Sequence, residues 1–210
     1  LSCDLVCNGN FEYCSFIPTY ISQIGLACPW GSVNGANPDY FNGDASGNPG
    51  FIVGVPSNDV GFQYSFNNSL GDKGYAGFGV SLNNVSNSTY NEYIYQKLKY
   101  PLLKNLTYKV SLKVSRADYY KYAVDNIGVF LSENNPYVSG PPGVNTGPIS
   151  YIPSQTWIWK NNNPPTPYIT ECNNWVNIEY FFTPQINGIQ YIVIGGFGDP
   201  NYTIVSGNVN

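Results

Sequence analysis

The stretch that decides the fold is Thr107-Tyr-Lys-Val-Ser-Leu-Lys-Val-Ser-Arg116. Its apolar side chains Val110, Leu112 and Val114 alternate with polar ones, as in a strand that has one face buried and the other in water. An amphipathic helix would repeat its apolar residues every three or four positions instead. The stretch therefore predicts a β-strand at the edge of an apolar core.

The preceding segment has the same two-residue period. Residues 93–99 place two tyrosines and two lysines, Lys97 and Lys99, on one face of an extended chain. Residues 101–105 connect this segment to the stretch above, and their short length predicts an antiparallel pair of strands.

Further strands and long loops complete the pattern. Strands are also predicted at 127–131, 176–182 and 189–194, the last being apolar on both faces apart from Gln190, as in a central strand. Clusters of Gly, Pro and Asn predict loops at 31–50, 134–147 and 160–167. We therefore expect one all-β domain over residues 1–210. It is an antiparallel β-sandwich (jelly roll) with long Gly/Pro/Asn-rich loops, a Cys-rich arm or first strand at 1–14 and a C-terminal extension at 199–210.

Composition excludes several classes of protein. The 210 residues are 42% hydrophobic and 10% charged, against about 25% charged in an average globular protein, so the chain is not a charged disordered segment. It has no histidine, which removes the commonest general base and metal ligand. A net charge of −4 argues against nucleic acid as a partner. No apolar run approaches the roughly 20 residues that cross a bilayer, so no membrane insertion is expected.

The polar residues and the cysteines point to export. Asn, Gly, Ser and Tyr stand where an intracellular protein would carry Lys and Glu. The spacing of the cysteines has no zinc-knuckle pattern, so disulfides in an oxidising compartment are the better explanation. The candidates are Cys3, Cys7, Cys14, Cys28 and Cys172. Two bridges among five cysteines allow fifteen arrangements, and each leaves one thiol unpaired or bridged to another chain.

Five Asn-x-Ser/Thr triplets make the chain a candidate glycoprotein. About four such triplets are expected by chance in a chain of this composition, so the number alone does not establish glycosylation. The candidate sites are Asn67, Asn84, Asn87, Asn105 and Asn201.

Short motifs rich in Asn, Gly, Pro and aromatic residues follow one another between residues 5 and 198. They include Leu5-Val-Cys-Asn-Gly-Asn-Phe-Glu12, Pro38-Asp-Tyr-Phe-Asn42, Val55-Pro-Ser-Asn58, Gly61-Phe-Gln-Tyr64, Gly74-Tyr-Ala-Gly77, Glu92-Tyr-Ile94, Asn126-Ile-Gly128 and Gln190-Tyr-Ile192. In this order they resemble the uncharacterised jelly-roll domain of secreted surface proteins of gliding Bacteroidota, which is similar to carbohydrate-binding modules. The resemblance implies export, a cell-surface location and a non-catalytic module, and it leaves the ligand open.

Two sets of oxygen ligands are candidates for a structural Ca²⁺. Asp39, Asn42 and Asp44 lie in a Gly/Asn-rich loop and offer the hard ligands that calcium prefers, although their spacing is not that of an EF-hand. The resemblance to carbohydrate-binding modules adds Asn10 and Glu12 beside the first strand as rival ligands. An ordinary solvated turn is the alternative for each of these residues.

Two tryptophans are candidates for carbohydrate binding. Trp157 and Trp159 share one face of an extended segment, with Tyr151 upstream, beside the loop that follows Lys160. If exposed, they form a flat surface on which sugar rings stack; if buried, they belong to the core.

The basic residues are concentrated in one part of the chain. Residues 97–121 hold seven of the nine positive charges and a net charge of +6, and the remainder of the chain carries −10. Lys97, Lys99, Lys109 and Lys113 are therefore predicted to form a face for an anionic partner, either a polymer or the acidic part of a second copy. A solvated sheet face is the alternative.

Two hypotheses on function follow, and neither is catalytic, because no carboxylate pair is recognisable and no catalytic residue is predicted. The first is an extracellular structural and adhesive subunit that self-assembles into a surface fibre, filament or layer. Its contacts would be terminal strands, such as residues 201–205, and charge-complementary faces. The alternative is a carbohydrate-binding module of a cell-surface adhesin or secreted enzyme. Other copies of the chain, a polysaccharide or another glycan are the corresponding partners.

Overall fold

The computed structural model of the chain describes residues 4–33, 35–45, 52–80, 82–83, 89–125, 127–137, 156–158, 168–197 and 202–204. Within these ranges every strand pairing is antiparallel. The helical elements there are three-residue 3-10 turns, η1 (Ile24–Leu26), η2 (Gly43–Ala45) and η4 (Asn68–Leu70). The prediction of an all-β antiparallel chain is confirmed.

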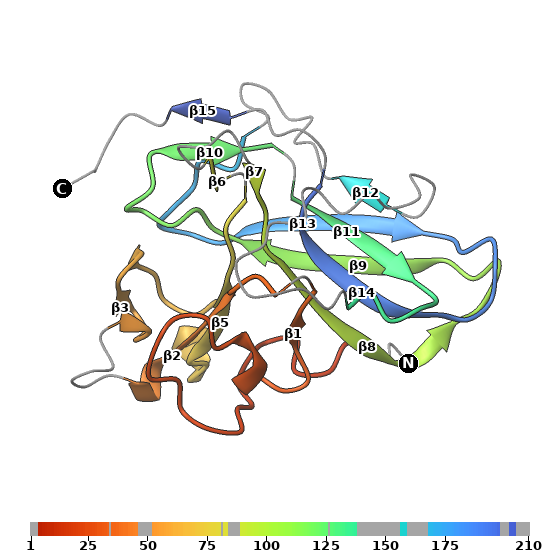
Figure 1. Cartoon of the computed structure of the whole chain (residues 1–210), viewed down its shortest axis with the longest axis horizontal. Coiled ribbons are helices and arrows are strands. Elements are labelled where there is room, and N and C mark those ends of the chain that lie inside the picture. The colour runs from red at the N-terminus through yellow and green to blue at the C-terminus, as the bar shows by residue number, and fades with distance from the viewer. Residues whose placement is uncertain are drawn as a thin grey trace.

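The largest sheet has five strands in the order β1-β8-β14-β11-β12. Its strands are β1 (Gly31–Ser32), β8 (Tyr93–Leu102), β14 (Ile189–Gly196), β11 (Ile127–Ser132) and β12 (Thr156–Ile158). The long strands β8, β14 and β11 run side by side through the middle of the molecule (Figure 1).

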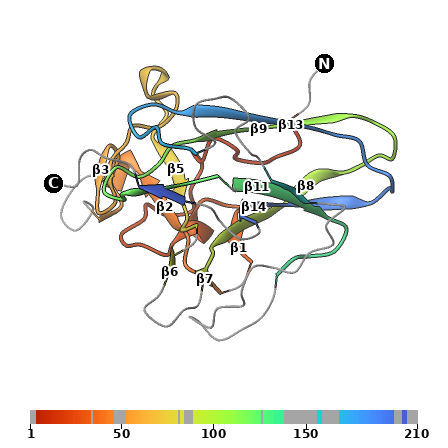
Figure 2. The ribbon, with the colours of Figure 1, turned by 90° about the horizontal axis from the view of Figure 1, so that it is seen from above.

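A second layer is formed by β9 (Tyr108–Val114) and β13 (Val176–Phe182), which pair along their whole lengths. Figure 2 shows β9 and β13 as one layer and β8, β11 and β14 as the other. The predicted pairing of residues 93–99 with 107–116 is wrong. The connection between β8 and β9 carries the chain from one sheet to the other, so each strand pairs with a strand much later in the sequence.

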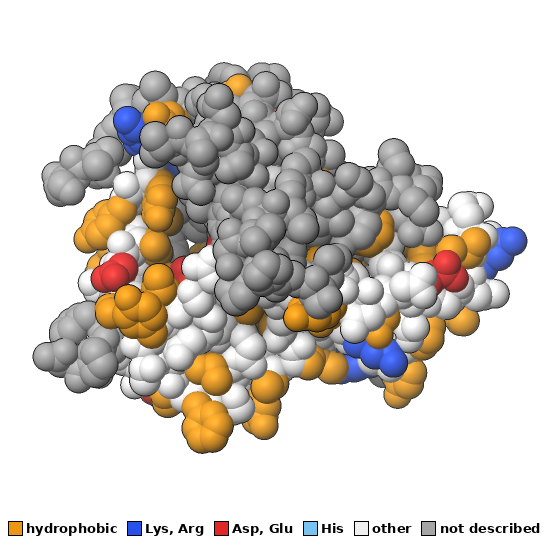
Figure 3. All heavy atoms as spheres, in the orientation of Figure 1, with side chains coloured by type: hydrophobic (Ala, Val, Ile, Leu, Met, Phe, Trp, Pro, Cys, Tyr) orange, Lys and Arg blue, Asp and Glu red, His pale blue; other side chains and the backbone are white. Residues whose placement is uncertain are grey.

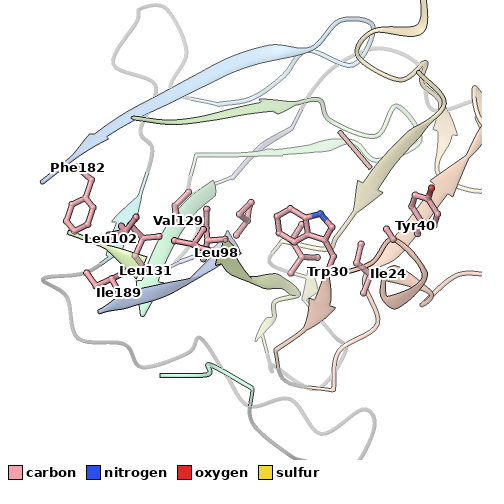
Figure 4. Packing of buried hydrophobic residues seen from close by; sticks show 13 residues of the cluster. Ile24, Trp30, Tyr40, Leu98, Leu102, Val129, Leu131, Phe182 and Ile189 are labelled. Atoms are coloured by element: carbon pink, nitrogen blue, oxygen red, sulfur yellow. The ribbon is translucent and has the colours of Figure 1, made fainter. Parts of the chain in front are cut away.

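The main core lies between these two layers (Figure 4). Leu98 and Leu102 of β8, Leu131 of β11 and Ile189 of β14 face Phe182 of β13. The alternating apolar residues of β9 pack against the same cluster from the other layer, as their two-residue period predicts. Trp30, Ile24 and Tyr40 of the N-terminal part extend the cluster at one end.

Strand β14 is buried on both faces, as predicted for a central strand. Ile192 and Ile194 face the main core, whereas Val193 packs on the other side of the sheet with Tyr93 and Phe197. A register shift between Ile189 and Tyr191 lets Ile189 and Ile192 both reach the main core although they are three positions apart.

Four short pairs surround these layers. They are β2 (Asp39–Asn42) with β5 (Gly74–Gly77), β3 (Ser57–Asn58) with β4 (Gly61–Phe62), β6 (Leu82–Asn83) with β7 (Thr89–Tyr90), and β10 (Tyr122–Val124) with β15 (Tyr202–Ile204). Gly74 is required where β5 begins, because a Cβ there would lie 2.1 Å from the carbonyl oxygen of Phe11. Strand β15 belongs to the predicted terminal strand, and here it pairs with β10 of its own chain.

Candidate functional site

A shallow cleft of about 350 Å³ lies where two segments far apart in sequence meet. Residues 63–69 follow β4, and residues 173–175 lead directly into β13. The lining consists of aromatic, amide and hydroxyl side chains: Gln63, Tyr64, Ser65, Phe66, Asn68, Ser69, Asn173, Asn174 and Trp175.

Trp175 joins the two segments. Its indole Nε1 donates a hydrogen bond of 2.9 Å to the carbonyl oxygen of Tyr64. Its ring also meets Tyr75 edge-on, with 5.7 Å between the ring centroids. Tyr75 stacks on Phe41, and burial raises the pKa of its hydroxyl well above the ordinary value, so it stays neutral. The orientation of Trp175 is therefore fixed by its contact with the Tyr75 ring and by its hydrogen bond to Tyr64 in the segment 63–69.

Two further rings give the cleft an exposed aromatic side. Tyr64 and Phe66 are 47% and 50% exposed. Phe62 packs edge-on against Tyr64 at a centroid separation of 5.3 Å. The ammonium of Lys113 lies 4.6 Å from the centroid of Phe66, a cation–π contact that orients this ring.

The amide side of the cleft is held by Glu171. Its Oε1 accepts hydrogen bonds from the backbone N–H groups of Asn173 (2.8 Å) and Asn174 (3.1 Å). These bonds lower the pKa of Glu171 below its ordinary value, so the carboxylate remains ionised and holds the turn. On the facing segment, Gln63 accepts a 2.9 Å hydrogen bond from the hydroxyl of Ser115. The amides of Asn173 and Asn174 themselves lie at the exposed surface.

This combination of groups can bind a sugar. Exposed aromatic faces take up the C–H face of a sugar ring, and side-chain amides donate to and accept from its hydroxyls. The described lining contains no carboxylate.

The predicted tryptophan surface falls largely outside the described residues. The backbone of Trp157 is in β12, opposite Val129, and its side chain falls outside the described residues. Trp159 and Tyr151 lie wholly outside them, so this site stays a prediction. The cleft was not predicted from the sequence, although Phe62, Tyr64 and Phe66, three aromatic residues at two-residue spacing, lie along one of its sides.

Two of the predicted calcium ligands, Glu12 and Asp44, are bound by protein donors. Both carboxylate oxygens of Glu12 accept from the backbone N–H of Lys73, at 2.8 and 2.9 Å, and Oε1 also accepts from Gly74 at 2.7 Å. The side-chain ammonium of Lys73 forms an ion pair of 2.6 Å with Asp44. Lys73 thus binds Glu12 through its backbone N–H and Asp44 through its ammonium group, so it is the cation that these two carboxylates share.

The remaining candidate ligands are also engaged or lie apart. Asp39 accepts from the backbone N–H of Ser22 at 2.7 Å, and burial raises its pKa. Asn42 is buried and hydrogen-bonds the hydroxyl of Tyr40 at 2.6 Å, while Asn10 is exposed. In the described part of the chain no group of three or more Cys, Asp or Glu side chains is arranged to hold a metal ion.

The four described cysteines, Cys7, Cys14, Cys28 and Cys172, carry free thiols, so the predicted disulfides among them are not formed in this structure. The side-chain amide of Gln96 accepts a hydrogen bond from the backbone N–H of Cys7 and donates one to its carbonyl oxygen, both at 2.9 Å. Cys28 donates to the Gly25 carbonyl, and Cys172 precedes the cleft loop. Cys3 lies outside the described residues.

The four predicted anion-binding lysines do not share one face. Lys97 and Lys99 are on the outer face of β8, and Lys109 and Lys113 are on the outer face of β9, in the opposite layer. Lys109 is paired with Glu179 at 2.6 Å. The alternation in each strand was predicted correctly, but the chain crosses from one sheet to the other between β8 and β9, so the two pairs of lysines lie on the outer faces of different layers.

Two of the candidate glycosylation sites are described. Asn67 lies beside the cleft and its amide nitrogen donates to Asp72 at 3.0 Å. Asn105 is exposed in the connection between β8 and β9, with a φ of 63°. Asn84, Asn87 and Asn201 lie outside the described residues.

Comparison with known proteins yields no relative: no protein-family model, curated protein or solved structure matches the chain. The helices of the described ranges are too short to cross a membrane.

Proposed function

We propose that the chain is a secreted, non-catalytic cell-surface module that binds carbohydrate at the cleft of Tyr64, Phe66 and Trp175. The observation that carries this proposal is the presence of exposed aromatic rings beside exposed amide side chains in one depression. Most of the affinity comes from ring stacking, and the amides of Asn173 and Asn174 select the pattern of hydroxyls.

The arrangement of the strands supports a jelly-roll topology for this module. Successive long strands change layer each time: β8, β11 and β14 belong to the five-stranded sheet, and β9 and β13 to the other. Such alternation is typical of double-sheet jelly rolls, many of which bind sugars. The resemblance of its motifs to the surface-protein domain of Bacteroidota agrees with this assignment and with export.

Affinity electrophoresis in gels that contain soluble xylan, mannan, β-glucan or alginate tests the proposal. We expect at least one polysaccharide to retard the protein. The double variant Tyr64→Ala/Phe66→Ala loses two stacking contacts, each worth about 0.5–1.5 kcal/mol, and should bind roughly tenfold more weakly.

The control is Tyr13→Ala/Phe16→Ala, which removes two exposed rings that do not line the cleft. It should be retarded as strongly as the wild type. Equal retardation of the cleft variant would overturn the assignment. If Trp157→Ala/Trp159→Ala alone abolished retardation, the sugar site would be the surface predicted from the sequence.

A second candidate function is self-assembly into an extracellular fibre or layer. It is favoured by exposed apolar side chains, among them Phe16 and Tyr20 in the N-terminal part and Phe181 in β13. Subunits of an assembly bury such side chains against their neighbours. Light scattering and electron microscopy, with and without reductant, test this function. Large regular particles would support it, and a uniform 23.2 kDa species would exclude it.

A further inference from the structure

Two turns at the end of the sandwich form one rigid projection, which we call the turn tip. It consists of residues 103–107 between β8 and β9 and residues 183–188 between β13 and β14. The backbone N–H of Asn105 donates to the carbonyl of Pro184 at 2.9 Å, and that of Lys104 donates to Oδ1 of Asn187 at 2.8 Å. The hydroxyls of Thr107 and Thr183 lie 2.8 Å apart.

The turn tip presents apolar side chains to solvent. Leu103 is 59% exposed, Leu106 50% and Ile186 38%. Surface turns normally carry polar residues. Here the hydrogen bonds between the two turns fix the backbone that bears three apolar side chains. Figure 3 shows hydrophobic and basic side chains, with an acidic one among them, at the end of the molecule where these turns lie.

The backbone donors of the first of these turns, from Leu103 to Leu106, are satisfied within the protein. The N–H of Leu103 donates to the Tyr108 hydroxyl at 2.8 Å and that of Leu106 to the carbonyl of Leu103 at 3.3 Å. With Lys104 and Asn105, this makes four consecutive N–H groups that need no water. An unsatisfied N–H costs several kcal/mol in an apolar medium, so this arrangement suits a surface that enters one.

The charge around the turn tip is favourable for anionic groups. Lys104 belongs to the tip, and neither turn contains a carboxylate. Lys97 and Lys99 lie on β8, which leads into it. Glu179 is paired with Lys109, and the carboxylate of Glu133 lies beside Gly188 at the end of the second turn, where that turn leads into β14.

We propose that the turn tip docks the protein on a lipid surface that carries anionic headgroups. Leu103, Leu106 and Ile186 enter the interface between headgroups and acyl chains, and Lys104 meets the phosphates. A lipid surface fits better than a second copy, because the three exposed apolar side chains of these turns are few for a stable protein interface, which buries roughly 800 Å² per partner. The docking does not span the bilayer.

This site is separate from the proposed sugar-binding cleft. Trp175 lies directly before β13 and the turn tip directly after it, so the seven residues of the strand hold the two sites about 23 Å apart. A protein built in this way can hold a glycan at one end while the other rests on lipid.

Co-sedimentation with phosphatidylcholine vesicles that contain about 30 mol% phosphatidylserine tests the inference. We expect the wild type to bind these vesicles and Leu103→Ser/Leu106→Ser to bind about 30-fold more weakly. Lys104→Gln should weaken binding about fivefold and leave the weaker binding to pure phosphatidylcholine unchanged. The control Phe16→Ser/Leu70→Ser removes two exposed apolar side chains outside the tip and should bind like the wild type.

A second measurement reports where the tip lies. Leu106→Trp should be quenched by lipids brominated on their acyl chains, and Leu70→Trp should not. Absence of wild-type binding, or equal loss in the control variant, would overturn the inference. So would an oligomer that Leu103→Ser/Leu106→Ser disperses without any vesicle binding, since the tip would then be an interface between copies. None of these outcomes depends on sugar binding at the cleft.

Discussion

Replacing Glu12 by Gln tests whether this residue holds the fold by hydrogen bonds or by binding calcium. In the structure the carboxylate accepts from the N–H groups of Lys73 and Gly74 at 2.7–2.9 Å, where β5 begins. Glutamine keeps one acceptor oxygen and turns an NH₂ group toward one of these donors. Hydrogen bonds to a charged group contribute about 1.5–3 kcal/mol, and one of the two donors keeps a partner. We therefore expect Glu12→Gln to lower the free energy of unfolding by about 2 kcal/mol.

For a chain of this size, about 2 kcal/mol corresponds to a fall of roughly 4–8 °C in melting temperature. Thermal unfolding followed by circular dichroism, with and without EDTA, measures it. EDTA should leave the wild-type melting temperature unchanged. Asp44→Asn, which breaks only a half-exposed ion pair with Lys73, should cost less than about 1 kcal/mol. The hydrogen-bond explanation is refuted if EDTA destabilises the wild type as much as Glu12→Gln does and has no effect on the variant.

Three further predictions concern the core and the titrating groups. Ile192→Ala empties a site that is 2% exposed in the central strand and should lower the free energy of unfolding by about 3 kcal/mol, measured by urea denaturation. The pKa of Glu171 is lowered in the folded protein. Its contribution to the free energy of unfolding is therefore complete above pH 4.5 and is lost as the pH falls below that value. A comparison of urea midpoints should show that Glu171→Gln removes this part of the acid dependence. The pKa of Tyr75 is raised by burial, so its contribution to the free energy of unfolding is lost as the pH rises above 10. Absorbance at alkaline pH should show that Tyr75 ionises after the exposed tyrosines. Ionisation at the same pH as the exposed tyrosines would contradict its burial.

Local alternation predicted the strands well because burial on one face leaves a two-residue period in the sequence. This held for β9, where the pattern of Val110, Leu112 and Val114 marks the buried face. It also held for β14, whose apolar residues on both faces reflect its position between β8 and β11. Both features depend on the immediate surroundings of each residue.

The partners of the strands could not be predicted in the same way. Five residues between β8 and β9 are enough either for a hairpin or for a crossing between layers. What distinguishes the two is the contact of Asn105 with Pro184, nearly eighty residues later. The same error placed the lysines of β8 and β9 on one face, because residues of paired strands share a sheet surface and residues of opposite layers do not.

The cleft depends on long-range contacts even more strongly. Tyr64 and Trp175 are 111 residues apart, and the hydrogen bond between them joins two segments that show no sign of each other in the sequence. The candidate calcium residues illustrate the opposite case. Their residue types suit a metal, but the backbone donors of Lys73 and Gly74, which the sequence does not place, take up the Glu12 oxygens.

The alternation of strands between layers also governs how the protein can fold. The centre of the larger sheet is filled by residues 189–196, whereas its neighbour β8 ends at residue 102. A growing chain therefore cannot close this core until residues 189–196 have emerged, and contacts of such long range make folding slow. Until then β8 and β11 have open edges and exposed apolar faces. Fragments that stop before β14 should therefore aggregate.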